Sequence, residues 1–91
     1  MTLSIIIPCF NEEKNIPIIL ERFKKIIGKK KIEVLLVNNG SYDGSLKILK
    51  VLIPKYKFAK LIDIKINKGY GNGIMSGLLK AKGKYIGYTH A

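Results

Sequence analysis

The chain has little of several residue types, and each shortage narrows what it can be. Cys9 is the only cysteine and His90 the only histidine among 91 residues. One cysteine cannot form an internal disulfide, and a zinc site needs several ligands at recognisable spacing. No apolar run approaches the roughly 20 residues that span a bilayer, and no basic leader precedes a long apolar core. We therefore expect a cytoplasmic chain without a structural metal, in which Cys9 is not catalytic.

Acidic residues are also scarce. Seventeen Lys and Arg residues against six Asp and Glu give a net charge of +11, and Arg22 is the only arginine. Such a charge suits nucleic acid, an anionic membrane surface or a phosphorylated substrate. Because lysine is plentiful along the whole chain, we interpret most of the charge as solvated surface and expect no nucleic-acid partner. The alternative is a basic α/β module that binds nucleic acid or anionic surfaces without catalysis, and its nucleic-acid binding would weaken steeply with salt.

Apolar residues make up 47% of the chain, and their spacing predicts one small α/β domain. Apolar, β-branched runs predict strands at 3–7, 32–37, 61–66 and 85–89, the third of them near an edge because it alternates with polar residues. Helical spacing predicts helices at 16–27, 44–53 and 74–81, with Asn15 and Asp43 as caps of the first two. Each helix is long enough for a right-handed crossover between parallel strands. The fold class is therefore α/β: a doubly wound, mainly parallel four-stranded sheet with helices on both faces.

The stretch EVLLVNNGSYDGS, residues 33–45, is the most informative part of the sequence. Its wholly apolar strand runs directly into a polar loop, and open α/β sheets bind their ligands at the carboxyl ends of the strands. Two further loops should reach the same edge: 8–13, with Asn11 and two glutamates, and 67–73, with glycines that a ligand can approach closely. Together the three loops predict a polar cleft of nucleotide size.

Two simpler interpretations of these loops stay open. Gly69, Gly71 and Gly73 do not form the dinucleotide fingerprint, which should follow the first strand, and no GKS or GKT makes them a Walker loop. These glycines can equally serve only a tight turn and close helix packing. Ser41 and Asp43 are as well explained as helix-capping groups as they are as ligand contacts.

Three segments carry a resemblance to a known family: SIIIPCFNEEKNI, EVLLVNNGSYDGS and NKGYGNGIMSGLLKAKGKYIGYTHA. In this order and spacing they resemble the amino-terminal half of a family 2 glycosyltransferase with the GT-A fold, over nearly the whole chain. The glycine-rich third loop and the A-x-G-x-Y sequence most resemble the branch of dolichyl- and polyprenyl-phosphate sugar synthases. The resemblance implies transfer of a sugar, with inversion, from a nucleotide-sugar to an acceptor such as a polyprenyl phosphate or a glycan. In the full-length protein, it implies a position in the cytoplasm or at the inner membrane surface.

The resemblance also implies which residues bind the donor, whereas no catalytic residue is expected in this chain. The resemblance implies a donor of the UDP- or GDP-sugar class, and an Asn side-chain carbonyl at position 39 can accept a hydrogen bond from the ring N–H of either uracil or guanine. The first and second loops would flank the base and ribose, and the third would border the same cleft. The substrate-binding residues are expected to be Pro8, Phe10, Glu12, Asn39, Ser41, Lys68, Gly71 and Asn72.

The sequence departs from the family's pattern in two places. Members commonly carry Asp-Asp where this chain has Asn38-Asn39, which leaves the choice of base open. The family's Asp-x-Asp motif, which holds Mg²⁺ or Mn²⁺ in the complete enzyme, would begin directly after His90-Ala91, so its principal metal ligand is absent. We therefore expect residues 1–91 to be a nucleotide-sugar-binding half, truncated before the metal site and inactive alone. Its uncovered sheet could self-associate.

Overall fold

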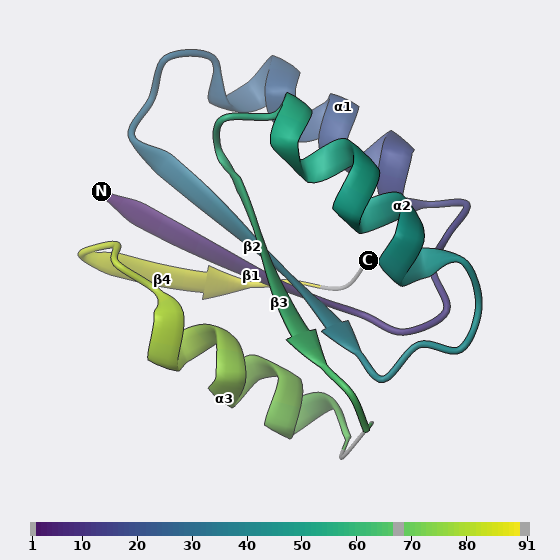
Figure 1. Ribbon diagram of the computed structural model, residues 1–91. Helices are drawn as coiled ribbons and strands as arrows, with labels where there is room; N and C mark the ends of the chain where they lie inside the picture. Colours follow the sequence, from purple (N-terminus) through teal and green to yellow (C-terminus); the bar gives the residue numbers. More distant parts are fainter. Residues whose placement is uncertain (1, 67–68, 90–91) are drawn as a thin grey trace.

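The computed structural model of the chain describes residues 2–66 and 69–89 and confirms the α/β class. Four parallel strands form one sheet in the order β3-β2-β1-β4, and three α-helices and one short 3₁₀-helix connect them (Figure 1). In chain order the elements are β1 (Leu3–Cys9), α1 (Ile16–Ile27), β2 (Ile32–Asn39), α2 (Ser45–Leu52), η1 (Ile53–Lys55), β3 (Ala59–Ile64), α3 (Tyr70–Lys80) and β4 (Tyr85–Tyr88).

Helices cover both faces of the sheet, as the uninterrupted apolar strands predict. Helices α1 and α2 lie on one face and α3 on the other (Figure 1). The first face buries a core cluster that includes Ile7, Leu20 and Leu49, and the second a smaller one of Ile6, Leu35 and Val37. Because β1 and β2 are central, their residues are covered on both sides and are mostly apolar. Strand β3 lies at an edge, which confirms the expectation drawn from its alternating pattern.

Two strands are longer at their carboxyl ends than their apolar runs suggested. Strand β1 continues through Pro8 to Cys9, although we expected it to end at residue 7. Proline has no backbone N–H group to donate to a neighbouring strand. This costs little at Pro8, because its backbone faces β4, and β4 pairs with β1 only as far as Ile6, opposite Tyr88. Strand β2 continues to Asn39 because neighbours on both sides still pair with it, Cys9 with Asn38 and Ile64 with Asn39.

The third strand and the third helix also begin earlier than expected. Strand β3 starts at Ala59, opposite Val34, and ends at Ile64 because β2 ends opposite it. Helix α3 starts at Tyr70 rather than at residue 74, so Gly71 and Gly73 lie in its first turn instead of in a loop. Glycine is a poor helix former, so the sequence of residues 70–73 predicts a loop and not the first turn of a helix. Close packing on the sheet accompanies this turn, since a Cβ built on Gly73 would lie 3.3 Å from Asn39 Nδ2 and 3.4 Å from Pro8 Cβ.

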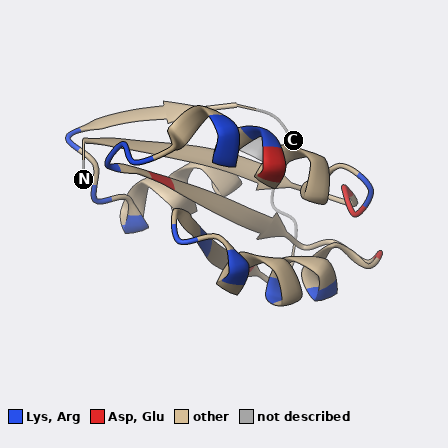
Figure 2. Ribbon diagram, turned by 90° about the horizontal axis from the view of Figure 1, so that it is seen from above, with Lys and Arg blue, Asp and Glu red and all other residues tan. Residues whose placement is uncertain are grey.

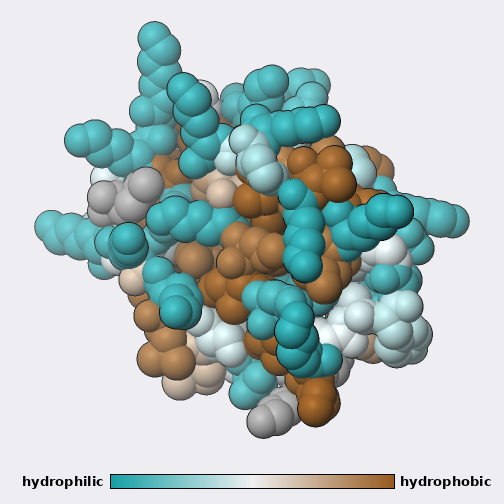
Figure 3. Space-filling model, viewed as in Figure 1, coloured by the Kyte–Doolittle hydropathy of each residue, from teal (hydrophilic) through white to brown (hydrophobic). Residues whose placement is uncertain are grey.

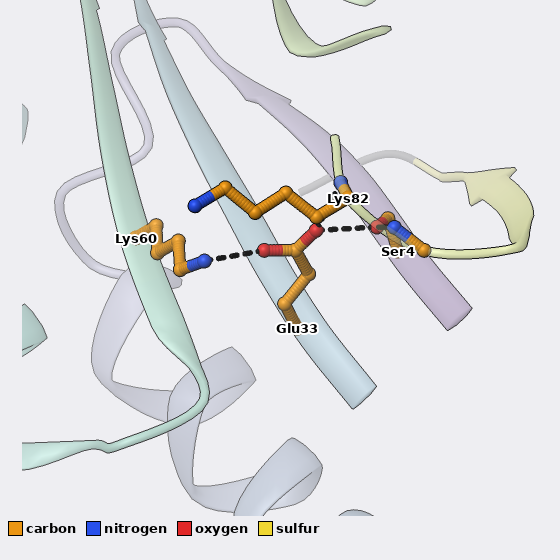
Figure 4. A network of polar contacts seen from close by, with 5 residues as sticks. Ser4, Glu33, Lys60 and Lys82 are labelled. Carbon is orange, nitrogen blue, oxygen red and sulfur yellow. Dashed lines mark hydrogen bonds and ion pairs between the residues drawn. The ribbon is translucent and has the colours of Figure 1, made fainter. Parts of the chain in front are cut away.

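A network of hydrogen bonds joins the strands at the end of the sheet where they begin. The fully buried Glu33 carboxylate accepts hydrogen bonds from Ser4 Oγ (2.5 Å), Lys60 Nζ (2.6 Å) and the backbone amide of Lys82 (2.6 Å) (Figure 4). The amide of Gly83 donates to Ser4 Oγ. Burial works to raise the Glu33 pKa, but the hydrogen bonds and the Lys60 charge outweigh it and hold the pKa at about 2. One carboxylate thus ties β1, β2, β3 and the loop before β4 together.

Candidate functional site

The first two loops at the carboxyl edge of the sheet are joined by hydrogen bonds. The Asn11 side-chain oxygen accepts from the backbone amides of Tyr42 (3.0 Å) and Asp43 (3.3 Å), and the Asn11 amide donates to Ser41 Oγ (3.0 Å). Asn11 has φ of 52°, the only positive value at a non-glycine residue in the described part of the chain. Asparagine tolerates this left-handed conformation better than most residues. The two loops therefore form one fixed unit, as the convergence of parallel strands predicts.

Asp43 and Ser45 extend this unit into the start of α2. Ser45 Oγ accepts from the Glu12 amide at 2.8 Å, and Asp43 Oδ1 accepts from the Ser45 amide at 2.8 Å. Partial burial works to raise the Asp43 pKa, but hydrogen bonds from Ser45 and Glu13 outweigh it and lower the pKa below its usual value. Gly44, not Asp43, is the N-cap residue, yet the Asp43 carboxylate serves an amide of the first turn. The prediction that Asp43 is the cap residue is therefore wrong by one position, although its carboxylate accepts a hydrogen bond from the first residue of α2.

Asn39 connects the second loop to the beginning of α3. Its side chain is almost fully buried, and Nδ2 donates to the Gly69 carbonyl at 3.1 Å. A Cβ built on Gly73 would lie 3.3 Å from Asn39 Nδ2 and 3.4 Å from Pro8 Cβ, so the three residues meet on the face that α3 covers. Asn39 Oδ1 is buried and has no hydrogen-bond partner among the described residues. Because such an atom normally costs free energy, it marks a place where a ligand donor would be stabilised.

Asn38 has a different environment. Side chains alternate along a strand, so Asn38 lies on the opposite face of β2 from Asn39. Its Nδ2 donates to Asp63 Oδ1 at 2.9 Å, while Asp63 Oδ2 pairs with Lys65 at 2.5 Å. The Lys65 ammonium group and the Asn38 amide both lower the Asp63 pKa. Asn38 Oδ1, like Asn39 Oδ1, is buried without a hydrogen-bond partner among the described residues. The two side chains differ in the face they occupy, since Asn38 joins β2 to β3 and Asn39 lies between Pro8 and the first turn of α3.

The structure brings most of the expected binding residues to one edge, although not all have free groups. Pro8 is buried against Gly73, and Phe10 is 39% exposed. The Ser41 hydroxyl is used within the protein, since it also donates to the Cys9 carbonyl at 3.4 Å. The Glu12 carboxylate accepts from Asn15 Nδ2 at 2.7 Å. Asn15 is the N-cap of α1 but makes no capping side-chain bond.

The remaining expected residues belong to the third segment. Gly71 is exposed, and a Cβ built on it would meet no atom within 4 Å. Asn72 is half-buried in the first turn of α3, and its carbonyl accepts from Ser76 Oγ at 2.9 Å. Lys68 lies outside the described residues, as do His90 and Ala91. At the carboxyl edge, the described part of this segment therefore presents mainly backbone groups.

Sequence reasoning missed one prominent side chain at this edge. Tyr42 is 83% exposed, and its ring stands edge-on to Phe10 with centroids 5.6 Å apart. The loop around Tyr42 is polar, and its sequence is typical of a turn. The one sequence feature that indicates Tyr42 is its position, as an aromatic residue in a polar loop between a buried strand and a helix.

Charge is unevenly distributed between the two ends of the sheet. Glu12, Glu13, Asp43 and Asp63 lie at the carboxyl edge together with Lys14 and Lys65, whereas the loops at the opposite end carry lysines and no carboxylate (Figure 2). Lys60 is half-buried, and every other lysine that the structure describes is exposed, which agrees with a solvated surface; Figure 3 shows long hydrophilic side chains projecting on one face. The carboxyl edge is therefore less basic than the net charge of +11 suggests.

Cys9 should be chemically inert in the folded protein. It is fully buried beneath the first loop, and burial, with a smaller contribution from Glu12, raises the pKa of its thiol to about 12. We expect no reaction with a thiol-specific disulfide reagent at pH 8 until denaturant unfolds the chain, because only an accessible thiolate reacts. Rapid labelling of the folded chain would contradict the buried position of Cys9.

Neither a metal-binding cluster nor a membrane-spanning helix occurs in the part of the chain described, residues 2–66 and 69–89. No three His, Cys, Asp or Glu residues there are grouped to hold a metal ion. None of the helices there is long and apolar enough to cross a membrane. We assign no metal to these residues.

Comparison with known proteins identifies the class to which this fold and site belong. The family model of Glycosyl transferase family 2 matches residues 4–91, so the chain belongs to that family. It is 32% identical over 88 residues to an undecaprenyl-phosphate 4-deoxy-4-formamido-L-arabinose transferase of Aeromonas hydrophila and 29% identical over 92 residues to a dolichyl-phosphate beta-glucosyltransferase of Dictyostelium discoideum. These matches cover 92% and 91% of the chain but only 27% and 28% of the relatives. The chain thus spans about a quarter of their length, and the resemblance to the polyprenyl-phosphate branch is confirmed.

Solved structures support the same assignment. Staphylococcus aureus TarS residues 1–349, in complex with UDP-GlcNAc, superimpose with a TM-score of 0.85 at 28% identity, covering 99% of this chain and 26% of TarS. A mannosyltransferase of Pyrobaculum calidifontis, in complex with GDP-Man and Mn²⁺, shares the fold with a TM-score of 0.73 at 22% identity, covering 92% of this chain and 25% of that one. The chain therefore belongs to glycosyl transferase family 2 and shares the GT-A architecture of these solved structures.

Proposed function

We propose that residues 1–91 form the nucleotide-sugar-binding half of a glycosyltransferase domain and that the donor's base is bound at Asn39. The observation that carries this proposal is the buried, unpartnered Asn39 Oδ1 at the carboxyl edge, between Pro8 and the first turn of α3. Ligands of open α/β sheets bind at this edge. The complexes of TarS with UDP-GlcNAc and of the Pyrobaculum enzyme with GDP-Man support a donor of this class.

The hydrogen-bonding pattern of Asn39 favours particular bases. Since Nδ2 is already engaged with Gly69, the group left for a ligand is an acceptor. Uracil, thymine and guanine carry a ring N–H that can donate to it, whereas the matching ring nitrogen of cytosine and adenine is itself an acceptor. We therefore propose a UDP- or GDP-sugar as donor, with CDP and ADP as poor ligands. An aspartate in this position would accept the same bond but would bring negative charge close to the diphosphate.

The first turn of α3 is the proposed neighbour of the ribose and diphosphate. Gly69, its N-cap residue, has φ of 101° and no capping side chain. The first amides of a helix lack partners within the helix and favour anions. Gly71 leaves the approach to these amides open. Gly71, Asn72 and Lys68 would contribute here, and Phe10 and Glu12 would flank the base and ribose.

The complete enzyme would transfer the sugar, with inversion, to a polyprenyl phosphate or a glycan, on the cytoplasmic side at the inner membrane surface. The lipid-phosphate names of the relatives motivate the first acceptor. Mg²⁺ or Mn²⁺ would neutralise charge on the leaving nucleoside diphosphate. We propose that this chain alone binds the donor without transferring sugar.

Nucleotide titrations of the wild-type chain and of Asn39 variants test this proposal. UDP or GDP should bind at least about tenfold more tightly than CDP or ADP, because the wrong base leaves Asn39 Oδ1 unpaired. Asn39→Leu should weaken UDP or GDP binding by a similar factor, whereas Asn39→Asp keeps an acceptor and should retain the order of bases. Isothermal titration calorimetry measures both effects, and circular dichroism confirms that each variant is folded. Failure of UDP, GDP and dTDP to bind, with or without Mn²⁺, would refute the proposal.

A further inference from the structure

Phe10 and Tyr42 form an exposed aromatic corner at the carboxyl edge of the sheet. Their ring planes meet at 85°, with centroids 5.6 Å apart. Phe10 is 39% exposed and Tyr42 83% exposed, so much of the aromatic surface faces outward instead of into either core cluster. Aromatic surface in an otherwise polar group of loops is suited to a flat ligand with an apolar face.

The backbone that carries Tyr42 is held in place before any ligand arrives. Asn11 Oδ1 accepts from the Tyr42 and Asp43 amides, and Ser41 Oγ accepts from the Asn11 amide. Asn11 adopts its positive φ while making all three contacts. A ligand at the corner would therefore find the two loops already ordered and would lose less free energy in ordering them.

The corner also lies close to the proposed base acceptor. Cys9, the last residue of β1, pairs with Asn38 in the parallel ladder, so Phe10 follows β1 at the level where β2 ends with Asn39. Pro8 and Asn39 both lie on the α3 face, where Gly73 approaches them. A base that donates its ring N–H to Asn39 would extend from that face toward Phe10, and Tyr42 is the aromatic side chain beside it.

We propose that Tyr42, together with Phe10, holds the nucleobase of the donor, so that Tyr42 is a determinant of donor affinity. This inference rests on the proposed function and adds a residue to it. Stacking on aromatic side chains accepts any flat base, whereas Asn39 selects among bases by hydrogen bonding. Removing Tyr42 should weaken all nucleotides alike and leave their order unchanged.

The test compares Tyr42→Ala, Tyr42→Phe and the control Tyr85→Ala in the 91-residue chain. Tyr85 is a similarly exposed tyrosine on β4, away from the three loops. For UDP, we expect Tyr42→Ala to raise Kd about tenfold, Tyr42→Phe to change it less than about twofold, and Tyr85→Ala to leave it unchanged, because stacking needs the ring but not the hydroxyl. Inorganic pyrophosphate, which has no base, should bind the wild type and Tyr42→Ala equally.

NMR spectroscopy supplies a direct reading of the contact. UDP should shift the Tyr42 ring protons upfield through the ring current of uracil, and pyrophosphate should not. If the wild type binds UDP and Tyr42→Ala binds it equally well, this inference fails while the proposed function stands. Equal weakening of UDP and pyrophosphate would also overturn it, since Tyr42 would then act on the loops rather than on the base. If the wild type binds no nucleotide, the proposed function fails first.

Discussion

Glu33→Ala is expected to lower the free energy of unfolding by about 2–3 kcal/mol, because the partners of the buried carboxylate lose their acceptor, although the Lys60 side chain is partly exposed. The substitution deletes the only carboxylate that joins Ser4, Lys60 and the Lys82 amide, and it leaves the buried hydroxyl and amide without their acceptor. Such a loss is a large share of the roughly 5–15 kcal/mol that stabilises a small domain. Urea denaturation followed by circular dichroism measures it.

The pH dependence of stability tests the same network. The pKa of Glu33 is about 2 in the folded protein, against an ordinary value of 4.5. A lowered pKa stabilises the folded state above pH 4.5, and the contribution, about 3 kcal/mol, is lost as the pH falls toward 2. Glu33→Gln should therefore flatten the fall in stability across this acidic window.

The control for both experiments is Glu21, an exposed carboxylate on α1 that accepts a hydrogen bond from the Tyr56 hydroxyl at 2.9 Å. Glu21→Ala should change the free energy of unfolding by less than about 0.5 kcal/mol, since surface substitutions have small effects. Equal losses from Glu21→Ala and Glu33→Ala would show that the buried network contributes no more than a surface contact.

Gly77→Ala should lower the free energy of unfolding by about 2 kcal/mol, even though alanine forms helices better than glycine by about 1 kcal/mol. The added methyl group would lie 2.4 Å from Ile6 Cγ2 and 2.9 Å from Cγ1, and Ile6 is fully buried. Helix α3 would have to move away from the sheet or Ile6 would have to leave its place, and interiors packed at this density tolerate neither easily. Chemical denaturation measures the change.

Gly71→Ala is the matched control in the same helix. No atom lies within 4 Å of a Cβ built there, so only the helix propensity changes. We expect a gain of up to about 1 kcal/mol, smaller if the first turn frays. The two glycines should therefore give effects of opposite sign. A stabilising Gly77→Ala would mean that α3 packs on Ile6 less closely than described.

The order of elements and the position of the site were readable from the sequence, but several boundaries were not. Uninterrupted apolar strands, helices of crossover length and polar residues after each strand predicted a doubly wound sheet with three loops at one edge. The start of α3 was missed because glycine propensity predicts a turn, while packing against Ile6, Pro8 and Asn39 supports a helix. Asn38 and Asn39 were assigned to a loop because amides suggest one, yet both lie within β2.

Some features of the site could also be predicted from the sequence, and others depend on tertiary contacts. Residue types alone placed Asn39 at the edge and suggested that it accepts a hydrogen bond. That Ser41 and Asn11 instead join two loops, and that Tyr42 stands against Phe10, depends on contacts between residues about 30 positions apart. Such pairs leave no periodic signal in a single sequence.

By itself, the sequence determined the fold class, the edge at which the site lies and the resemblance to the glycosyltransferases, because these follow from local patterns and from motifs read in order. Only the tertiary structure decided which asparagine lies against α3. Asn38 and Asn39 are chemically identical neighbours, but successive side chains of a strand point to opposite faces, so one binds Asp63 and the other meets α3. It likewise decided that Glu33 is buried and paired, since its partners come from three separate segments of the chain.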